Sequence, residues 1–257
     1  MTSIVIYIPA YNVGHTLPRV LERIPKEITP LIKEILIVDN ASTDNTYVTA
    51  ITWKNKDRFN NIHIIKNEEN KGYGGSQKIA YQYCINKHYD YVVMLHGDAQ
   101  YAPEFIPKLF QKAKESNADL VFGSRIRGAP LKGGMPFWKF IGNRVLTALE
   151  NMVLGMHLTE FHSGYRLYNI NALREIPFVN CSNNYYFDSQ ILIQMRLANM
   201  RIEEIEIPTY YAKDTQSPTI TQTALYAFSI LSMLGGYILH KYNIKQNKAF
   251  QLTKNEL

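Results

Sequence analysis

Short apolar runs rich in β-branched residues recur along the chain, and amphipathic or polar stretches separate them. Runs of about five residues with this composition are typical of buried β-strands. They occur at Ile4–Ile8, Glu34–Val38, Asn61–Lys66, Tyr91–Leu95, Ala118–Phe122 and Arg201–Pro208.

Helices are expected between these strands, at Leu17–Ile24, Gln77–Asn86, Pro103–Glu115, Phe137–Leu154 and Ile191–Ala198. Strands that alternate with helices at this spacing pair in parallel, because each helix returns the chain to the same edge of the sheet. The pattern therefore predicts an α/β fold with a mostly parallel central sheet.

The first four predicted strands end in polar or glycine-rich turns, namely Pro9–Asn12, Asp39–Asp44, Asn67–Gly75 and His96–Gln100. Open α/β sheets bind ligands beyond the carboxyl ends of their strands, so we expect a nucleotide at this edge. The glycines at 72, 74 and 75 would let the backbone approach such a ligand closely. The sequence lacks the Gly-Lys-Ser/Thr ending of a Walker loop and a GxGxxG after the first strand, which argues against a P-loop enzyme and a dinucleotide-dependent oxidoreductase.

A carboxylate, an imidazole and a carboxamide follow the fourth strand in alternation, as His96, Asp98 and Gln100. At alternate positions of an extended chain these side chains would point the same way. Such ligands suit Mg²⁺ or Mn²⁺ shared with a diphosphate. Taken alone, the segment fits a polar turn without a ligand equally well.

Composition narrows the class of protein. The chain has 257 residues, of which 46% are hydrophobic and 19% charged, and this describes one large globular domain. The net charge of +6 suits a phosphate-bearing substrate or an anionic membrane, and the chain has no dense basic stripe for nucleic acid. The two cysteines, Cys84 and Cys181, indicate a reducing compartment, and Met1–Ser3 leaves no room for a signal peptide before the first strand.

Four motifs resemble the family 2 glycosyltransferases of the GT-A fold. They are PAYN at 9–12, VDNASTDNT at 38–46, NEENKGYGGS at 67–76 and HGDAQ at 96–100. The resemblance spans Ser3 to Tyr211 and is closest to the dolichyl-phosphate mannose synthase group and its bacterial polyprenyl-phosphate relatives. It implies one GT-A domain at 1–213 and a C-terminal extension at 214–257, which is an apolar helical segment followed by a basic tail.

The resemblance also implies a donor site and a metal site. The residues carried over to the donor are Pro9, Tyr11, Asn12, Asp39, Gly72, Tyr73, Gly74, Asp98 and Lys213, with Asp39 on the nucleobase. Asp98 and Gln100 would hold Mg²⁺ or Mn²⁺. The family's D-x-D-x-Q has become His96-Gly97-Asp98-Ala99-Gln100, so His96 is either a metal ligand or, as we favour, a donor to the phosphates.

Acceptor residues follow from two further motifs. The segment Gly123-Ser124-Arg125 and the segment 160–166, which resembles the group's DxTSGFR, imply an anion site. The residues expected around the acceptor phosphate are Arg125, Arg144, Ser163 and Arg166. The expected catalytic residues are Asp98, Arg125 and Asp188. Asp188 would either orient sugar hydroxyls or hold an arginine in place. Alternatively, Asp188 only complements the dipole of its helix.

Two apolar segments bear on membrane binding. The helix Phe137–Leu154 is either an ordinary core helix or a helix resting on the membrane interface. Thr215–Leu239 has no Asp, Glu, Lys or Arg, but its apolar part, Ala224–Leu239, is shorter than a spanning helix requires. Because Gly235-Gly236 interrupts it, we expect an interfacial or dimer-forming hairpin.

The sequence therefore predicts an inverting glycosyltransferase that moves a sugar from GDP-mannose or a UDP-sugar to a polyprenyl phosphate. It would lie in the cytoplasm, peripheral at the inner face of the membrane, and both a monomer and a homo-oligomer stay open. Two rivals stay open. One is a transferase that uses a glycan hydroxyl as acceptor and Asp188 as base, and the other is a non-catalytic nucleotide-sugar-binding protein with a degenerate site.

Overall fold

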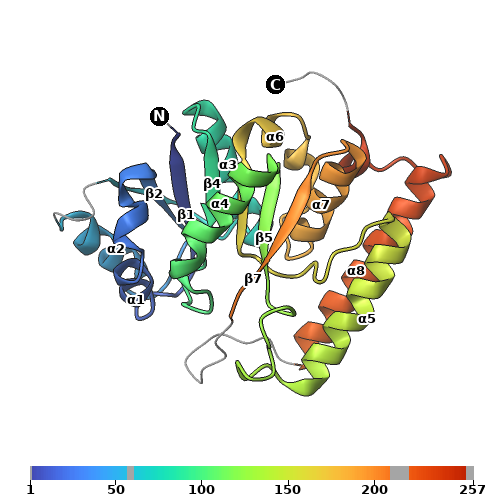
Figure 1. Cartoon of the computed structure of the whole chain (residues 1–257), viewed down its shortest axis with the longest axis horizontal. Helices are drawn as coiled ribbons and strands as arrows, with labels where there is room; N and C mark the ends of the chain where they lie inside the picture. Colours follow the sequence, from blue (N-terminus) through green and yellow to red (C-terminus); the bar gives the residue numbers. More distant parts are fainter. Residues whose placement is uncertain (1, 57–60, 209–219, 253–257) are drawn as a thin grey trace.

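The computed structural model describes residues 2–56, 61–208 and 220–252, and within them helices cover both faces of a seven-stranded sheet (Figure 1). The strands are β1 (Ile4–Ala10), β2 (Ile32–Asp39), β3 (Ile62–Lys66), β4 (Tyr91–Met94), β5 (Leu120–Ser124), β6 (Arg166–Asn169) and β7 (Ile202–Glu206). The α-helices are α1 (Leu17–Glu22), α2 (Thr46–Lys54), α3 (Tyr73–Asn86), α4 (Ile106–Ser116), α5 (Phe137–Leu154), α6 (Ile170–Arg174), α7 (Phe187–Leu197) and α8 (Ile220–Lys241). Short 3₁₀ helices lie at Lys26–Leu31, Pro103–Phe105, Phe178–Asn180 and Lys248–Phe250.

The strand order is β3-β2-β1-β4-β6-β5-β7. Strands β1 to β4 are mutually parallel and β5 is parallel to β7, whereas β6 is antiparallel to both of its neighbours. The predicted α/β fold with a mostly parallel sheet is confirmed. Because β6 is antiparallel, Arg166 at its start pairs with Met94 at the end of β4 and Phe122 near the end of β5. The loop before β6 therefore lies at the ligand edge of the sheet.

Both faces of the sheet are buried, which explains the continuous apolar runs. On β1, Val5 and Tyr7 pack with α3, α6 and α7, whereas Ile4, Ile6 and Ile8 pack with α1, α2 and α4. The same alternation holds along β4. The core thus consists of two apolar layers with the sheet between them.

Two local predictions were wrong. Strand β6 was not expected, because Arg166-Leu167-Tyr168-Asn169 has polar residues at both ends and lacks the apolar run of a strand. Helix α3 begins at Tyr73 and not after Ser76, since Gly72 has φ of 78° and takes the position before the first turn.

The expected hairpin near the C-terminus is also wrong. Helix α8 is continuous from Ile220 to Lys241, and Gly235-Gly236 lies within it. It lies beside α5 at the side of the molecule away from α1 and α2 (Figure 1). Its residues Ile230 and Leu234 belong to the core layer of α3 and α7.

By length and composition, Thr221–Lys241 of α8 could cross a membrane, with a mean hydropathy of 1.3 and 22% of its apolar window buried in the protein. The predicted boundary at residue 213 falls in 209–219, outside the described residues, and the division at that point stays a prediction.

Candidate functional site

The turns after β1, β2 and β4 are joined by hydrogen bonds at one edge of the sheet. The Asn12 backbone N–H donates to Ser42 Oγ over 3.0 Å, and the Thr43 N–H donates to Asn12 Oδ1 over 2.8 Å. Thr16 Oγ1 donates to the Gly97 carbonyl over 2.7 Å. The expected donor segments are therefore adjacent, and Asn12 adopts a left-handed conformation with φ of 54° to join them.

Asp39 is completely buried at the end of β2. Its Oδ1 accepts the Ser42 N–H over 3.1 Å, whereas its Oδ2 has no hydrogen-bond partner among the described residues. A cavity of about 440 Å³ lies just beyond the ends of β2 and β3, and it is lined by Ala41, Ser42, Lys66, Asn67 and Glu68 but not by Asp39 itself. A buried carboxylate oxygen without a donor is unfavourable unless a ligand supplies one. The nucleobase contact expected of Asp39 therefore stays a prediction, with one carboxylate oxygen that could accept a donor from a ligand.

The glycines after β3 lie close to another part of the protein's own backbone. A Cβ on Gly72 would lie 2.5 Å from the Asn183 carbonyl oxygen, and one on Gly74 would lie 2.4 Å from the Ser182 carbonyl oxygen. The close approach that requires glycine is therefore to the protein's own 182–183 backbone. Tyr73 between them is held by stacking on Tyr185, with 5.2 Å between the ring centroids.

The residues after β4 do not continue as an extended chain, so the predicted alternation of side chains is wrong. The chain turns at Gly97–Ala99, where Ala99 has φ of 60°, and Asp98 Oδ1 accepts the Gln100 N–H over 3.1 Å. His96 packs edge-on to Tyr73 and Tyr101, and its Nε2 lies 3.4 Å from the Tyr73 hydroxyl. Burial lowers the pKa of His96, so its ring is neutral near pH 7.

The same turn is compatible with a divalent cation. Within the described residues, no group of three or more His, Cys, Asp or Glu side chains comes close enough to hold a metal ion. Asp98 is only half-buried and has one oxygen that the turn does not use. A single carboxylate is sufficient where a substrate diphosphate and water complete the coordination, as Mg²⁺ usually requires.

Asp188 at the start of α7 is enclosed by donors. It accepts from the Tyr73 hydroxyl over 2.8 Å and from Gln77 Nε2 over 3.2 Å, and Arg166 Nη1 lies 3.9 Å from it. Its exposed fraction is 4%. A carboxylate bound in this way holds Tyr73 and Arg166 in position and is poorly placed to accept a proton from a substrate hydroxyl.

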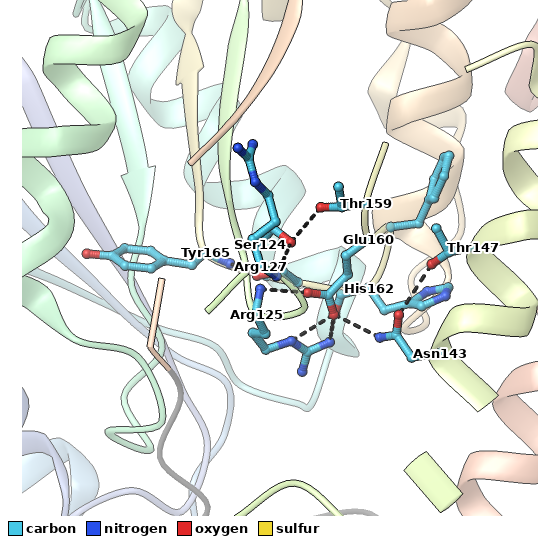
Figure 2. Close-up of polar contacts among 12 residues, drawn as sticks. Ser124, Arg125, Arg127, Asn143, Thr147, Thr159, Glu160, His162 and Tyr165 are labelled. Carbon is cyan, nitrogen blue, oxygen red and sulfur yellow. Dashed lines mark hydrogen bonds and ion pairs between the residues drawn. The ribbon is translucent and has the colours of Figure 1, made fainter. Parts of the chain in front are cut away.

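A second cluster of polar side chains lies where β5 ends and in the loop before β6. Glu160 is fully buried and accepts from the backbone N–H and Nε of Arg125, over 2.9 and 2.8 Å, and from Asn143 Nδ2 over 2.9 Å. Arg125 Nη2 also forms an ion pair with it. Figure 2 shows Arg125 and Asn143 both directed at this carboxylate, with Thr147 next to Asn143. Burial alone would raise the pKa of Glu160, but the Arg125 guanidinium, with His162 and the Asn143 amide, keeps that pKa below its usual value.

Lys139 on α5 is a candidate that the sequence reasoning did not select. It is half-buried within electrostatic range of Arg125 and Glu160. Burial, and next the neighbouring Arg125 cation, lower the pKa of Lys139 to about 8. Two cations, Arg125 and Lys139, lie near the single Glu160 carboxylate. The net positive charge of this group would be neutralised by an incoming phosphate. The spacing of Lys139, Asn143, Thr147 and Glu150, all on one side of α5, was the signal that could have identified it.

The other predicted acceptor residues are more scattered. Arg166 is fully buried, and four of its N–H donors go to three backbone carbonyls and the Tyr168 hydroxyl. Ser163 is likewise buried, whereas Arg144 is exposed on α5. This placement favours a supporting role for Arg166 over direct phosphate binding. Lys213 lies outside the described residues.

Comparison with known proteins identifies a family and several relatives. Residues 5–177 match the model of the family described as Glycosyl transferase family 2. The chain is 28% identical over 220 residues to the UDP-N-acetylglucosamine--dolichyl-phosphate N-acetylglucosaminyltransferase of Methanococcus voltae, covering 82% of this chain and 86% of that protein. It is also 28% identical over 210 residues to the undecaprenyl-phosphate mannosyltransferase of Micrococcus luteus, covering 80% and 82%.

A solved structure shares the fold. The glucosyl-3-phosphoglycerate synthase of Mycobacterium tuberculosis, crystallised with Mn²⁺, UDP and phosphoglyceric acid, superposes with a TM-score of 0.68 at 19% identity. The match covers 95% of this chain and 80% of that one. The architecture of sheet and helices described above is therefore the same as in that enzyme.

Replacing Glu160 should lower the free energy of unfolding far more than replacing an exposed carboxylate that pairs with an arginine. Glu160→Gln leaves the buried Arg125 cation without its counter-charge, and we expect a loss of about 3–5 kcal/mol in the free energy of unfolding. Glu104→Gln is the matched control, because Glu104 makes a bidentate pair with Arg23 in which both side chains are exposed, and should cost less than about 1 kcal/mol. Urea denaturation measures both; equal losses would contradict the assignment.

Proposed function

This chain belongs to glycosyl transferase family 2, and we propose that it transfers a sugar from a nucleoside diphosphate sugar to a polyprenyl phosphate at the cytoplasmic face of a membrane. Two relatives that match more than four-fifths of their length are named for transfer to dolichyl or undecaprenyl phosphate. Their names support the acceptor class, and the surface of this chain supports it independently.

The observation that carries the proposal is the inverted polarity of α5. Its polar residues Asn143, Thr147 and Glu150 are buried, whereas large apolar side chains point to solvent. Those exposed side chains are Phe137, Trp138, Ile141, Val145 and Met152. A surface helix of a soluble protein has the opposite arrangement. An apolar outer face beside an anion site is what an enzyme with a lipid-anchored phosphate acceptor requires.

Helix α8 extends this apolar surface. Leu225, Phe228 and Leu231 are all exposed on it, and α8 lies beside α5 (Figure 1). Exposed lysines follow at 241, 245 and 248. Cations next to an apolar face attract the anionic headgroups of a cytoplasmic leaflet. We therefore take the bilayer to be the partner of this surface.

The chemistry needs few groups from the protein. Asp98, with Gln100, would hold Mg²⁺ or Mn²⁺ against the donor diphosphate, where the cation stabilises the charge of the leaving group. Arg125 and Lys139 orient the acceptor phosphate, which is already ionised near neutral pH and needs no general base. Its attack from the face opposite the leaving group inverts the anomeric centre. The enclosed carboxylate of Asp188 fits this reaction better than it fits a hydroxyl acceptor.

We further propose that the donor base is uracil. Asp39 has one carboxylate oxygen without a partner among the described residues, because Ser42 occupies the other. Uracil presents a single N–H between two carbonyls, whereas guanine presents two adjacent N–H donors that would require both oxygens.

UDP should therefore bind at least about tenfold more tightly than GDP in isothermal titration with Mg²⁺. Asp39→Asn should weaken UDP binding by about tenfold or more, because the variant loses a charged acceptor for the base N–H. Glu115→Gln is the control, since it changes an exposed carboxylate on α4 that lies outside the donor site. Equal affinity for UDP and GDP would refute the base assignment without affecting the acceptor assignment.

The acceptor is tested by product analysis. Purified protein is incubated with UDP- and GDP-sugars, Mg²⁺ and either undecaprenyl or dolichyl phosphate or soluble glycans, and the products are identified by mass spectrometry. We expect a glycosyl phosphate lipid. Transfer only to a glycan would favour the hydroxyl-acceptor alternative, and nucleotide binding with no product in any reaction would favour a non-catalytic protein.

A further inference from the structure

Four buried or half-buried polar side chains behind the acceptor region have no part in the chemistry above. They come from separate parts of the chain: Glu150 from α5, His162 from the loop before β6, Ser189 from α7 and Tyr226 from α8. Ser189 Oγ donates to Glu150 Oε1 over 2.9 Å, and His162 Nε2 lies 3.2 Å from Glu150 Oε2. His162 Nδ1 lies 3.0 Å from the Tyr226 hydroxyl, and the two rings pack edge to face.

The proton arrangement in this cluster follows from burial. Burial raises the pKa of Glu150 to about 8 and lowers the pKa of His162 to about 4, so both are neutral near pH 7. Glu150 Oε2 and His162 Nε2 lie 3.2 Å apart, yet neither has a hydrogen-bond partner among the described residues. A small rotation of the protonated Glu150 carboxyl would let it donate to His162 Nε2, and His162 Nδ1–H would then donate to the Tyr226 oxygen. The charged groups that face the cluster from the surrounding elements are Arg125, Glu160, Arg166 and Asp188.

The cluster adjoins the substrate groups on two sides. The His162 carbonyl accepts from Arg125 Nη2 over 3.2 Å, and Glu160 lies two residues before it. On the other side, Ser189 directly follows Asp188 in α7. A displacement of His162 would therefore move the Arg125 guanidinium, whereas the nucleobase end of the donor site is remote from it in the fold.

We propose that Tyr226, His162 and Glu150 form a positioning relay through which α8 holds the 159–165 loop, and with it Arg125, in the geometry that receives the acceptor phosphate. The inference rests on the proposed function. Because α8 also carries part of the exposed apolar surface, the relay makes the position of the acceptor loop depend on where α8 lies. Tyr226 does not touch the substrate; it acts through His162.

Tyr226→Phe removes the hydroxyl and keeps the ring. We expect kcat/KM for the lipid acceptor to fall about tenfold, in line with the loss of one buried hydrogen bond, while the Kd for UDP stays within about twofold. Tyr237→Phe is the matched control, because Tyr237 is a buried tyrosine of the same helix that packs on Phe250 away from the loop. It should leave both parameters unchanged.

Glu150→Gln tests the neutral state of the relay without any activity measurement. The folded-state pKa of Glu150 lies above its ordinary value of 4.5, so the wild-type protein loses stability as the pH rises from about 4.5 to about 8. The variant does not titrate, and its amide can still donate to His162. Its Tm should therefore exceed that of the wild type by a margin that is small at pH 5 and largest at pH 8.

The outcomes separate this inference from the proposed function. If the wild type transfers no sugar to lipid, the proposed function fails, and the relay is judged by the Glu150→Gln melting curves alone. A lower Tm for Glu150→Gln than for the wild type at pH 8 would overturn the neutral pair. Wild-type kinetics in Tyr226→Phe, or an equal loss of UDP binding, would overturn the positioning role.

Discussion

The proposed acceptor region depends on the hydrogen bonds and the ion pair that stabilise the buried Glu160 carboxylate. A full charge without access to water is stable only if donors surround it, and here they come from β5 and α5, as the Arg125 backbone and guanidinium and the Asn143 amide. The end of β5 and one long helix are thereby fixed to a single group in the loop before β6. This interaction also determines where the positive charge of Arg125 lies.

That constraint has a consequence for the surface. A helix that must supply polar groups to a buried carboxylate turns its polar side inward, and α5 does so with Asn143, Thr147 and Glu150. Several of its large apolar side chains, such as Phe137 and Ile141, then face outward, whereas Leu154 packs in the core. An exposed apolar face of this kind promotes aggregation in water, whereas contact with a bilayer would bury it. Under the proposed function, α5 would thus connect the anion site to the membrane in which a polyprenyl phosphate resides.

Much of the fold was predictable because strands buried on both faces read as continuous apolar runs, and the donor turns follow directly from their ends. Strand β6 was not predictable, since Arg166 owes its burial to pairing with β4 and β5 and not to an apolar run. Lys139 and Glu150 were missed for a related reason: polar side chains at helical spacing normally mark the solvent side. The glycines at 72 and 74 were predicted to let a ligand approach the backbone, and only the structure reveals that the 182–183 backbone also approaches them.

The most direct test of the central claim, that the outer face of α5 lies in the membrane interface, is quenching of tryptophan fluorescence by brominated lipids. The chain has two tryptophans: Trp138 is exposed on α5, and Trp53 is buried on α2 at the other side of the molecule (Figure 1). In Trp53→Phe protein, anionic vesicles with brominated acyl chains should strongly quench Trp138, whereas Trp53 in Trp138→Phe protein should be unaffected. An unquenched Trp138, as expected if a second copy of the chain covered this face, would contradict the account.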